Sequence, residues 1–197
     1  MKGWMKWAVA GVVVLFLALY GVSSYNGFVS SEEAVSSQWS QVENVYQRRY
    51  DLIPNLVGTV KGYASHEKET LTAVIEARAK VGQINLNAGN LTPEMLSMFQ
   101  AAQGELSSAL SRLMVVVERY PDLKANTLFQ DLMTQLEGTE NRIAVERMRY
   151  NTVAQSYNAG IRRFPGVVVA RIAGFSGKPY FKAEEGAASA PKVNFEN

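Results

Sequence analysis

Apolar residues recur every three or four positions between residues 35 and 81, and this period constrains the fold more than any other feature of the chain. The series comprises Val35, Trp39, Val42, Tyr46, Tyr50, Ile53, Val57, Val60, Ala64, Leu71, Val74, Ile75 and Val81. The spacing is that of an amphipathic α-helix, and about 46 positions at 1.5 Å each make a helix of roughly 70 Å. Such a helix has one continuous apolar edge, along which neighbouring helices are expected to pack.

Two more long helices are expected after this one. The segment 82–90, with two glycines and three asparagines, ends the first helix. Thr92-Pro93-Glu94 then combines a capping hydroxyl, a proline in the first turn and an acid, which predicts a helix start. The second helix stops at Pro121, and the third runs from there to Phe164-Pro165-Gly166.

The predicted fold class is all-α. No strand-period run of useful length occurs before residue 167, and the apolar piece 167–175 is expected to form a short C-terminal helix. Short connections favour an antiparallel bundle of three long helices with coiled-coil-like packing, and the count becomes four if the first helix bends into two halves.

The N-terminal segment 1–27 is expected to be a membrane anchor. It carries no charge between Lys6 and Glu32, and residues 4–23 supply the roughly 20 apolar positions that a spanning helix needs. Trp4, Trp7, Phe16 and Tyr20 are the candidate anchor residues, because aromatic rings favour membrane interfaces. A cleaved secretory signal is the alternative, although Gly21-Val22-Ser23 is a poor cleavage site.

Two lysines, Lys2 and Lys6, precede the apolar run, and the next basic residue is Arg48. The positive-inside rule then places the N-terminus in the cytoplasm and exports the rest of the chain. We therefore expect a single-pass protein of the cytoplasmic (inner) membrane, with an anchor at 1–27, a helical bundle at 28–176 and a C-terminal tail at 177–197. The end of the tail, 183–197, is small and polar, so the tail is expected to have no core of its own.

Pro54 interrupts the first helix within YQRRYDLIPNLVGTVKGYASHE (46–67). A proline inside a helix removes one backbone hydrogen bond and costs about 3 kcal/mol or produces a kink. Because the apolar edge continues on both sides, we expect a kink at Pro54. The freed carbonyl of Tyr50 then needs a donor, for which Arg48, Arg49, Asn55 or a water are candidates.

Charged residues interrupt the apolar edges of two helices. Arg49 lies beside the first edge, and Glu140 and Arg147 interrupt the third helix between Leu136 and Tyr150. A half-buried guanidinium needs a carboxylate or carbonyl partner, so Arg48 or Arg49 is expected to meet Glu140 or another acid of that helix. The alternative is that these charges face solvent and form local pairs worth a few tenths of a kcal/mol.

Composition and motifs favour no enzymatic class. Lys and Arg number 20 against 18 Asp and Glu, so the net charge does not argue for a nucleic acid partner. There is no cysteine and a single histidine, His66, which is expected to be an ordinary surface residue. No catalytic, phosphate-binding or metal-binding motif is found. We therefore expect no catalytic residue, no metal site, no cofactor and no small-molecule substrate.

The chain resembles the LemA family over essentially its whole length. The resemblance is densest in the segments QRRYDLIPNLVGTVKGYASHE (47–67), ERYPDLKAN (118–126), GTENRIAVERMRYN (138–151), SYNAGIRRFP (156–165) and PYFKAEEGA (179–187). It implies a membrane-anchored bundle of long antiparallel helices with a four-helix, bromodomain-like topology and no established enzymatic activity. It also implies that polar residues of the kink and the third helix form a family pattern.

We predict from this pattern a structural polar network. Its candidate members are Arg48, Arg49, Asp51, Glu140, Arg147, Tyr150 and Asn151. One departure from the family is visible at Glu146, where family members usually carry a small residue, and this charge stands beside the predicted network.

The expected function is that of a scaffold or structural protein of the bacterial cell envelope. The anchored bundle is expected to self-associate, because anchored parallel neighbours lose less orientational freedom on association, and to present a surface to other envelope proteins. The alternative is a sensor or binding module whose kinked first helix switches on ligand or partner binding. The C-terminal tail is expected either to act as a docking peptide or to lie along the bundle.

Overall fold

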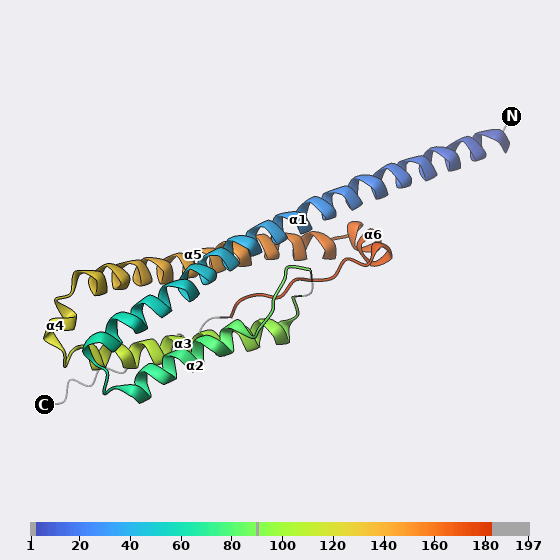
Figure 1. Cartoon of the computed structure of the whole chain (residues 1–197). Coiled ribbons are helices and arrows are strands. Elements are labelled where there is room, and N and C mark those ends of the chain that lie inside the picture. The colour runs from blue at the N-terminus through green and yellow to red at the C-terminus, as the bar shows by residue number, and fades with distance from the viewer. Residues whose placement is uncertain (1–2, 90, 183–197) are drawn as a thin grey trace, which may run out of the picture.

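The structure, a computed structural model, describes residues 3–89 and 91–182, and these residues contain helices but no strand. Figure 1 shows one long rod with the other helices packed beside its second half. The helices are α1 (Gly3–Tyr63), α2 (Lys68–Gly82), α3 (Pro93–Val117), α4 (Pro121–Lys124), α5 (Thr127–Arg162) and α6 (Gly166–Ala173).

Helix α1 has two parts with different surroundings. It is 61 residues long, about 90 Å at 1.5 Å per residue. Its first part, up to residue 19, is exposed throughout and projects beyond the other helices (Figure 1). From Val35 onwards its apolar edge is buried against the other helices. The helix between the two parts is unbroken, so the projecting rod and the packed helix are one element.

The prediction of one helix from residue 35 to residue 81 is wrong. Helix α1 continues through Pro54 and ends at Tyr63, and the chain reverses at residues 64–67 before α2 begins. The Glu67 carboxylate accepts hydrogen bonds from Arg119 and from the Tyr120 hydroxyl, each at 3.0 Å, so the reversal is held against the corner after α3. The break coincides with residues 65–70 (SHEKET), none of which is apolar.

The other helices begin and end near the expected positions. The Thr92 side chain accepts a hydrogen bond from the Met95 amide at 3.2 Å, so the predicted cap of α3 is present. Asn126 caps α5 in the same way through the Phe129 amide. The single turn α4, between α3 and α5, was not expected from the sequence. Gly174, with a φ of 80°, ends α6 in the left-handed conformation that favours glycine.

The core lies between α1, α2, α3 and α5, of which each runs opposite to the one before it (Figure 1). Helix α1 packs mainly against α5, and α2 packs mainly against α3. The apolar edge predicted for α1 forms much of this core, with Trp39, Ile53 and Val60 almost completely buried. Helix α6 packs across α1 and α5 near the point where the rod leaves the bundle.

Candidate interaction site

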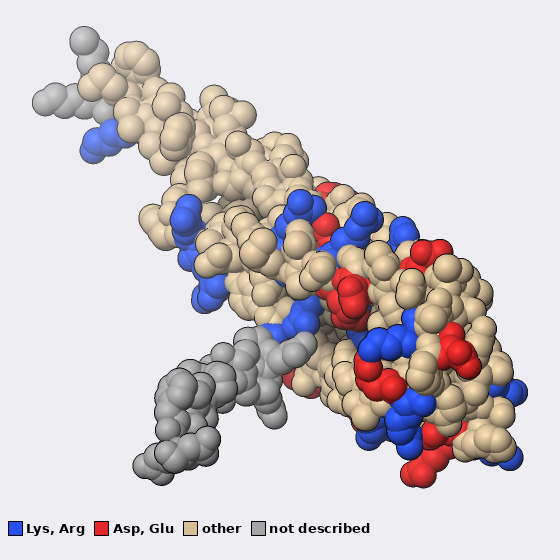
Figure 2. Space-filling view, turned by 90° about the vertical axis from the view of Figure 1, so that its left-hand side faces the viewer, with Lys and Arg blue, Asp and Glu red and all other residues tan. Residues whose placement is uncertain are grey.

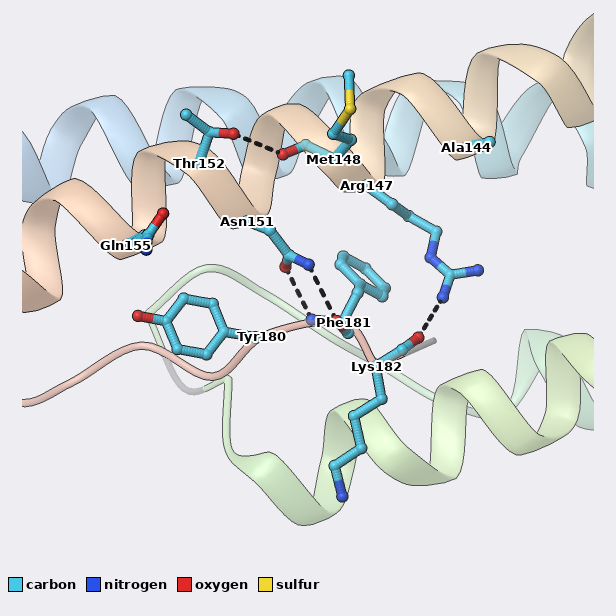
Figure 3. Close-up of a pocket in the computed structure, with 9 residues that line it drawn as sticks. All are labelled: Ala144, Arg147, Met148, Asn151, Thr152, Gln155, Tyr180, Phe181 and Lys182. Atoms are coloured by element: carbon cyan, nitrogen blue, oxygen red, sulfur yellow. Dashed lines mark hydrogen bonds between the residues drawn. The ribbon is translucent and has the colours of Figure 1, made fainter. Parts of the chain in front are cut away.

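Residues 177–182 follow α6 in an extended conformation and lie along α5 (Figure 3), where they contact side chains of α1, α3 and α5. We call these residues the C-terminal segment. Of the two expectations for the tail, these residues follow the one in which it lies along the bundle, and the Phe181 side chain is buried in the core of the bundle. The remainder of the predicted tail, 183–197, lies outside the described residues.

Three side-chain amides bind the backbone of the C-terminal segment. Asn158 accepts from the Lys178 amide and donates to the Lys178 carbonyl, both at 2.8 Å. Asn151 makes the same pair of bonds with Phe181, both at 2.9 Å (Figure 3). Gln100 of α3 donates to the Lys182 carbonyl at 3.0 Å and accepts from its amide at 3.4 Å. An isolated extended chain leaves its backbone groups unpaired, and here side-chain amides take the place of a neighbouring strand.

Two side chains of the segment anchor it. The Phe181 ring stacks on Trp39 at a centroid distance of 5.9 Å and meets the edge of Tyr150 at 5.5 Å. The Arg147 guanidinium lies 5.0 Å from the centroid of the Phe181 ring and donates to the Lys182 carbonyl at 2.9 Å. At the other end, the Lys178 ammonium lies 2.6 Å from a carboxylate oxygen of Glu32 on α1.

A shallow groove of about 610 Å³ borders the segment on its α5 side. Its lining residues are Ala144, Arg147, Met148, Asn151, Thr152, Gln155, Tyr180, Phe181 and Lys182, and Figure 3 shows them. Met148 is exposed beside this groove. The α5 surface beside the segment is therefore open to solvent.

The tyrosines Tyr150 and Tyr157 of α5 are buried under the segment. Neither hydroxyl has a hydrogen-bond partner among the described residues. Burial raises the pKa of the Tyr150 hydroxyl well above its ordinary value, and the neighbouring Tyr180 adds to the effect. Burial, assisted by the charge of Glu32, raises the pKa of Tyr157 to about 12. Both groups stay neutral at ordinary pH.

A second polar cluster lies at the centre of the bundle around Arg49. The Arg49 Nε lies 2.8 Å from a carboxylate oxygen of Glu140, across the α1–α5 contact. Its two other nitrogens donate to the Gln103 side-chain oxygen at 3.2 Å and to the Ser107 hydroxyl at 2.7 Å. The Arg49 side chain is 4% exposed and that of Glu140 is 42% exposed. Arg49 therefore joins α1, α3 and α5 through one buried guanidinium.

The carbonyl that Pro54 leaves without a helical donor is bound by an arginine from another helix. Arg78 of α2 donates from its Nε to the Tyr50 carbonyl at 3.1 Å. Its guanidinium also lies 3.6 Å from the centroid of the Tyr50 ring. The sequence predicts the need for a donor but not this residue, because Arg78 is distant in the chain and its role depends on the reversal at 64–67.

The residues of the predicted polar network lie in separate places in the structure. Arg49 and Glu140 come together, whereas Arg147, Tyr150 and Asn151 surround the C-terminal segment. Arg48 is exposed, and Asp51 is exposed and accepts a hydrogen bond from Gln47. The C-terminal segment and Arg49 are also bound by side chains that were not predicted from the sequence, namely Gln100, Gln103, Ser107 and Asn158.

Glu146, the visible departure from the family pattern, has partners of its own. It accepts from the Gln38 amide at 2.7 Å and pairs with Arg149 at 2.8 Å on the same helix. Its side chain is consequently mostly buried on the α1 side of α5. The extra charge thus adds a contact between α1 and α5 and does not enter the Arg49 cluster.

The predicted anchor residues lie on the projecting part of α1. Trp4, Trp7 and Phe16 are exposed, and Tyr20 is partly covered. Helix α1 is the one helix among residues 3–89 and 91–182 whose length and hydropathy suffice to cross a membrane, and the qualifying window is exposed. Within the same residues, no group of three or more His, Asp or Glu side chains is placed to hold a metal ion.

Comparison with known proteins places this architecture in a family. The model of the LemA family matches residues 38–195. Magnetosome protein MamQ 2 of Paramagnetospirillum magneticum is 32% identical over 189 residues, which cover 86% of this chain and 68% of that protein. Magnetosome protein MamQ of Magnetospirillum gryphiswaldense is 33% identical over 80% of this chain and 64% of its own length. Protein LemA of Metamycoplasma hominis is 25% identical over 76% of this chain and 64% of its own length.

Proposed function

The chain belongs to the LemA family, and from that premise we propose that it is a membrane-anchored helical scaffold of the bacterial cell envelope. The observation that carries the proposal is the continuity of α1, in which an exposed apolar span and a buried bundle helix form one element. A bundle held on such a rod has a fixed direction relative to its anchor. This rigidity suits a structural part that positions other proteins.

In this proposal α1, α2, α3 and α5 form a four-helix bundle of bromodomain-like topology, which self-associates through neighbouring anchored copies. Anchored copies lose less translational and orientational freedom on association than free ones do, so weak contacts between bundles suffice. Other envelope proteins are the expected further partners. The proposed role is non-enzymatic, and the names of the relatives, two magnetosome proteins and a LemA protein, specify no reaction.

We place the protein in the cytoplasmic membrane as a single-pass protein with its N-terminus in the cytoplasm. Lys2 and Lys6 precede the apolar run, which supports this orientation. A reporter fused after Asn197 tests it. A reporter that is active only in the periplasm should be active, and activity of a cytoplasmic reporter alone would reverse the orientation.

The self-association is tested by light scattering of the intact protein extracted in a mild detergent. The expected mass, after subtraction of the detergent, corresponds to several copies and increases with protein concentration. A mass of one copy at the highest concentration reached would contradict the scaffold. Electron microscopy of the same sample provides an independent measure, because stacked or ring-shaped assemblies of the rod should be visible.

A further inference from the structure

Helix α6 is packed against the part of α1 where the exposed apolar rod begins. The Phe175 ring, just after α6, lies 5.6 Å from the rings of Tyr25 and Phe28, measured between centroids. At the start of α6, a side chain on Gly166 would bring its Cβ within 2.9 Å of the Phe28 ring and 3.7 Å of the Tyr20 hydroxyl. Glycine at this position therefore lets α6 approach α1 closely.

This contact fixes the height of α6 relative to the apolar span. The apolar run 4–23, in which Lys6 near its start is the one charged residue, is about 30 Å long as a helix, which matches the hydrocarbon thickness of a bilayer. Tyr20 lies one turn before the end of that run, and α6 touches α1 at Tyr20 and Phe28. If the run spans the membrane, α6 lies at the level of the lipid headgroups (Figure 1).

The outer side of α6 is apolar and uncovered. Phe164 is 85% exposed, Val168 is 51% exposed and Ile172 is 84% exposed. Val168 and Ile172 are one turn apart in α6 and share a side of the helix, while Phe164 precedes the helix by two residues. Ala170, on the opposite side, is buried in the bundle. Large apolar side chains on the outer side of a short helix are unfavourable in water.

The charged residues of α6 and of the chain just before it are all basic. Arg163 and Arg171 are exposed, and Arg162 beside them donates to the Asn158 carbonyl at 2.9 Å. No acidic residue occurs between Glu146 and Glu184 in the sequence. Figure 2 shows Lys and Arg side chains at the end of the body from which the rod projects, while the rod itself is almost entirely tan. Apolar and basic side chains together are the combination by which interfacial helices bind anionic bilayers.

We propose that α6 and Phe164 form an interfacial helix that lies in the headgroup region of the bilayer spanned by α1. Phe164, Val168 and Ile172 enter the boundary with the acyl chains, and Arg163 and Arg171 contact anionic headgroups. The inference rests on the proposed membrane anchor. It adds a second point of membrane contact, which holds the bundle end against the lipid and restricts tilting about α1.

Four single-cysteine variants test the proposal, because the chain contains no cysteine. Ile172→Cys probes α6, Val12→Cys probes the span, and Val115→Cys on α3 is the matched control, since Val12 and Val115 are also exposed. The full chain carrying a fluorescent label at each site is reconstituted in phosphatidylcholine–phosphatidylglycerol vesicles, one set with a quencher near the lipid headgroup and one set with a quencher deep in the acyl chains. Val168→Cys is a second probe of α6.

We expect the headgroup quencher at position 172, and the acyl-chain quencher at position 12, to reduce the emission at least about twofold more than at position 115. Quenching at position 12, with positions 168 and 172 no more quenched than position 115, would overturn the interfacial helix and leave the anchor intact. Absence of quenching at position 12 would overturn the anchor itself. A blue-shifted but unquenched label at position 172 would show that protein, and not lipid, covers α6.

The role of the arginines is tested in the same system. Arg163→Gln together with Arg171→Gln should lower the quenching at position 172, as should replacement of phosphatidylglycerol by phosphatidylcholine. The matched control is Arg112→Gln on α3, which should leave the quenching unchanged. Quenching that is independent of both changes would remove the anionic headgroups from the proposal.

Discussion

At the scale of single residues, Arg49 is the most consequential side chain of the bundle. It is charged and buried, and its three nitrogens contact Glu140, Gln103 and Ser107 on two other helices. Sequence reasoning could find Arg49 and Glu140, because each interrupts an apolar edge. It could not find Gln103 or Ser107, because neutral polar residues interrupt a helix surface without an evident need for a partner.

Replacing Glu140 by Ala should lower the free energy of unfolding by about 2 kcal/mol, because it leaves the buried guanidinium without its counter-charge. Urea unfolding monitored by circular dichroism measures the effect. The control is Glu105→Ala, which removes the exposed pair between Lys80 and Glu105 and should cost less than about 1 kcal/mol. Equal losses in the two variants would show that Glu140 is no more than a surface partner.

Tyr157 should make stability depend on pH in the alkaline range. Burial raises its pKa from 10.0 to about 12 in the folded protein. Between these values the unfolded chain releases the proton and the folded chain keeps it, so the free energy of unfolding falls as pH rises, by up to about 1.4 kcal/mol per pH unit. Tyr150, whose pKa burial also raises, should add to the loss.

Tyr157→Phe should therefore reduce the alkaline loss and change stability little at neutral pH, since the hydroxyl has no hydrogen-bond partner among the described residues. Urea unfolding at a series of pH values up to about 12 measures it. Tyr63→Phe is the control, because it changes an exposed tyrosine and retains Tyr157. An unchanged pH dependence in Tyr157→Phe would contradict the prediction.

At the scale of elements, the main difference from the sequence-based expectation is the reversal between α1 and α2. Ala64 and Leu71 are seven residues apart, so the apolar spacing stays in phase with a helix across the break. Periodicity alone therefore cannot distinguish a helix that continues from one that turns back. The polar run at 65–70 is the local signal, and the contacts of Glu67 with Arg119 and Tyr120 depend on the folded arrangement.

Pro54 and Arg78 should be energetically coupled through the Tyr50 carbonyl. Arg78→Met should destabilise the protein, because that carbonyl then loses its donor. In a Pro54→Ala background, the new backbone N–H can donate to Tyr50, so Arg78→Met should cost about 1 kcal/mol less. A double-mutant cycle measured by urea unfolding gives the coupling. Lys80→Met, the control on α2, should be additive with Pro54→Ala.

The C-terminal segment should depend on Phe181 for its attachment. Phe181→Ala removes a buried ring at a cost of about 3 kcal/mol, enough to speed the local opening of the segment roughly a hundredfold. Hydrogen exchange of the Lys178 and residue-181 amides, which Asn158 and Asn151 hold, measures the opening. Lys182→Ala, which removes an exposed side chain of the same segment and keeps its backbone, should have a much smaller effect. Unchanged exchange in Phe181→Ala would show that the amides alone hold the segment.

At the scale of the whole molecule, the all-helical class and the apolar N-terminal run could be predicted from the sequence, because both depend on composition and local period. The sequence left open whether the tail lies along the bundle or acts as a docking peptide, and the contacts that attach residues 177–182 could not be predicted. Short extended segments bury little of their own surface, and this one depends on amides and aromatic rings from three helices. Its place is decided by tertiary structure and not by its own sequence period.

The bundle should fold without the projecting part of α1. A chain that begins at Tyr20 lacks, among the residues that the structure describes, the exposed residues 3–19 of the rod, so it should be soluble without detergent. Its thermal midpoint is followed by circular dichroism. Measured in the detergent that the full chain requires, the midpoint should lie within a few degrees of that of the full chain. A chain that begins at residue 40 also lacks the buried Val35 and Trp39 and should unfold. Loss of helix in the first variant beyond the residues removed would contradict the prediction.

The unbroken passage of α1 from the apolar run into the bundle has a geometric consequence. Each residue inserted between them would turn the body by about 100° around the rod and raise it by 1.5 Å. The number of residues in this passage therefore sets which face of the body lies above which face of the membrane span. Copies that associated through one face of the span would bring the same face of their bodies together.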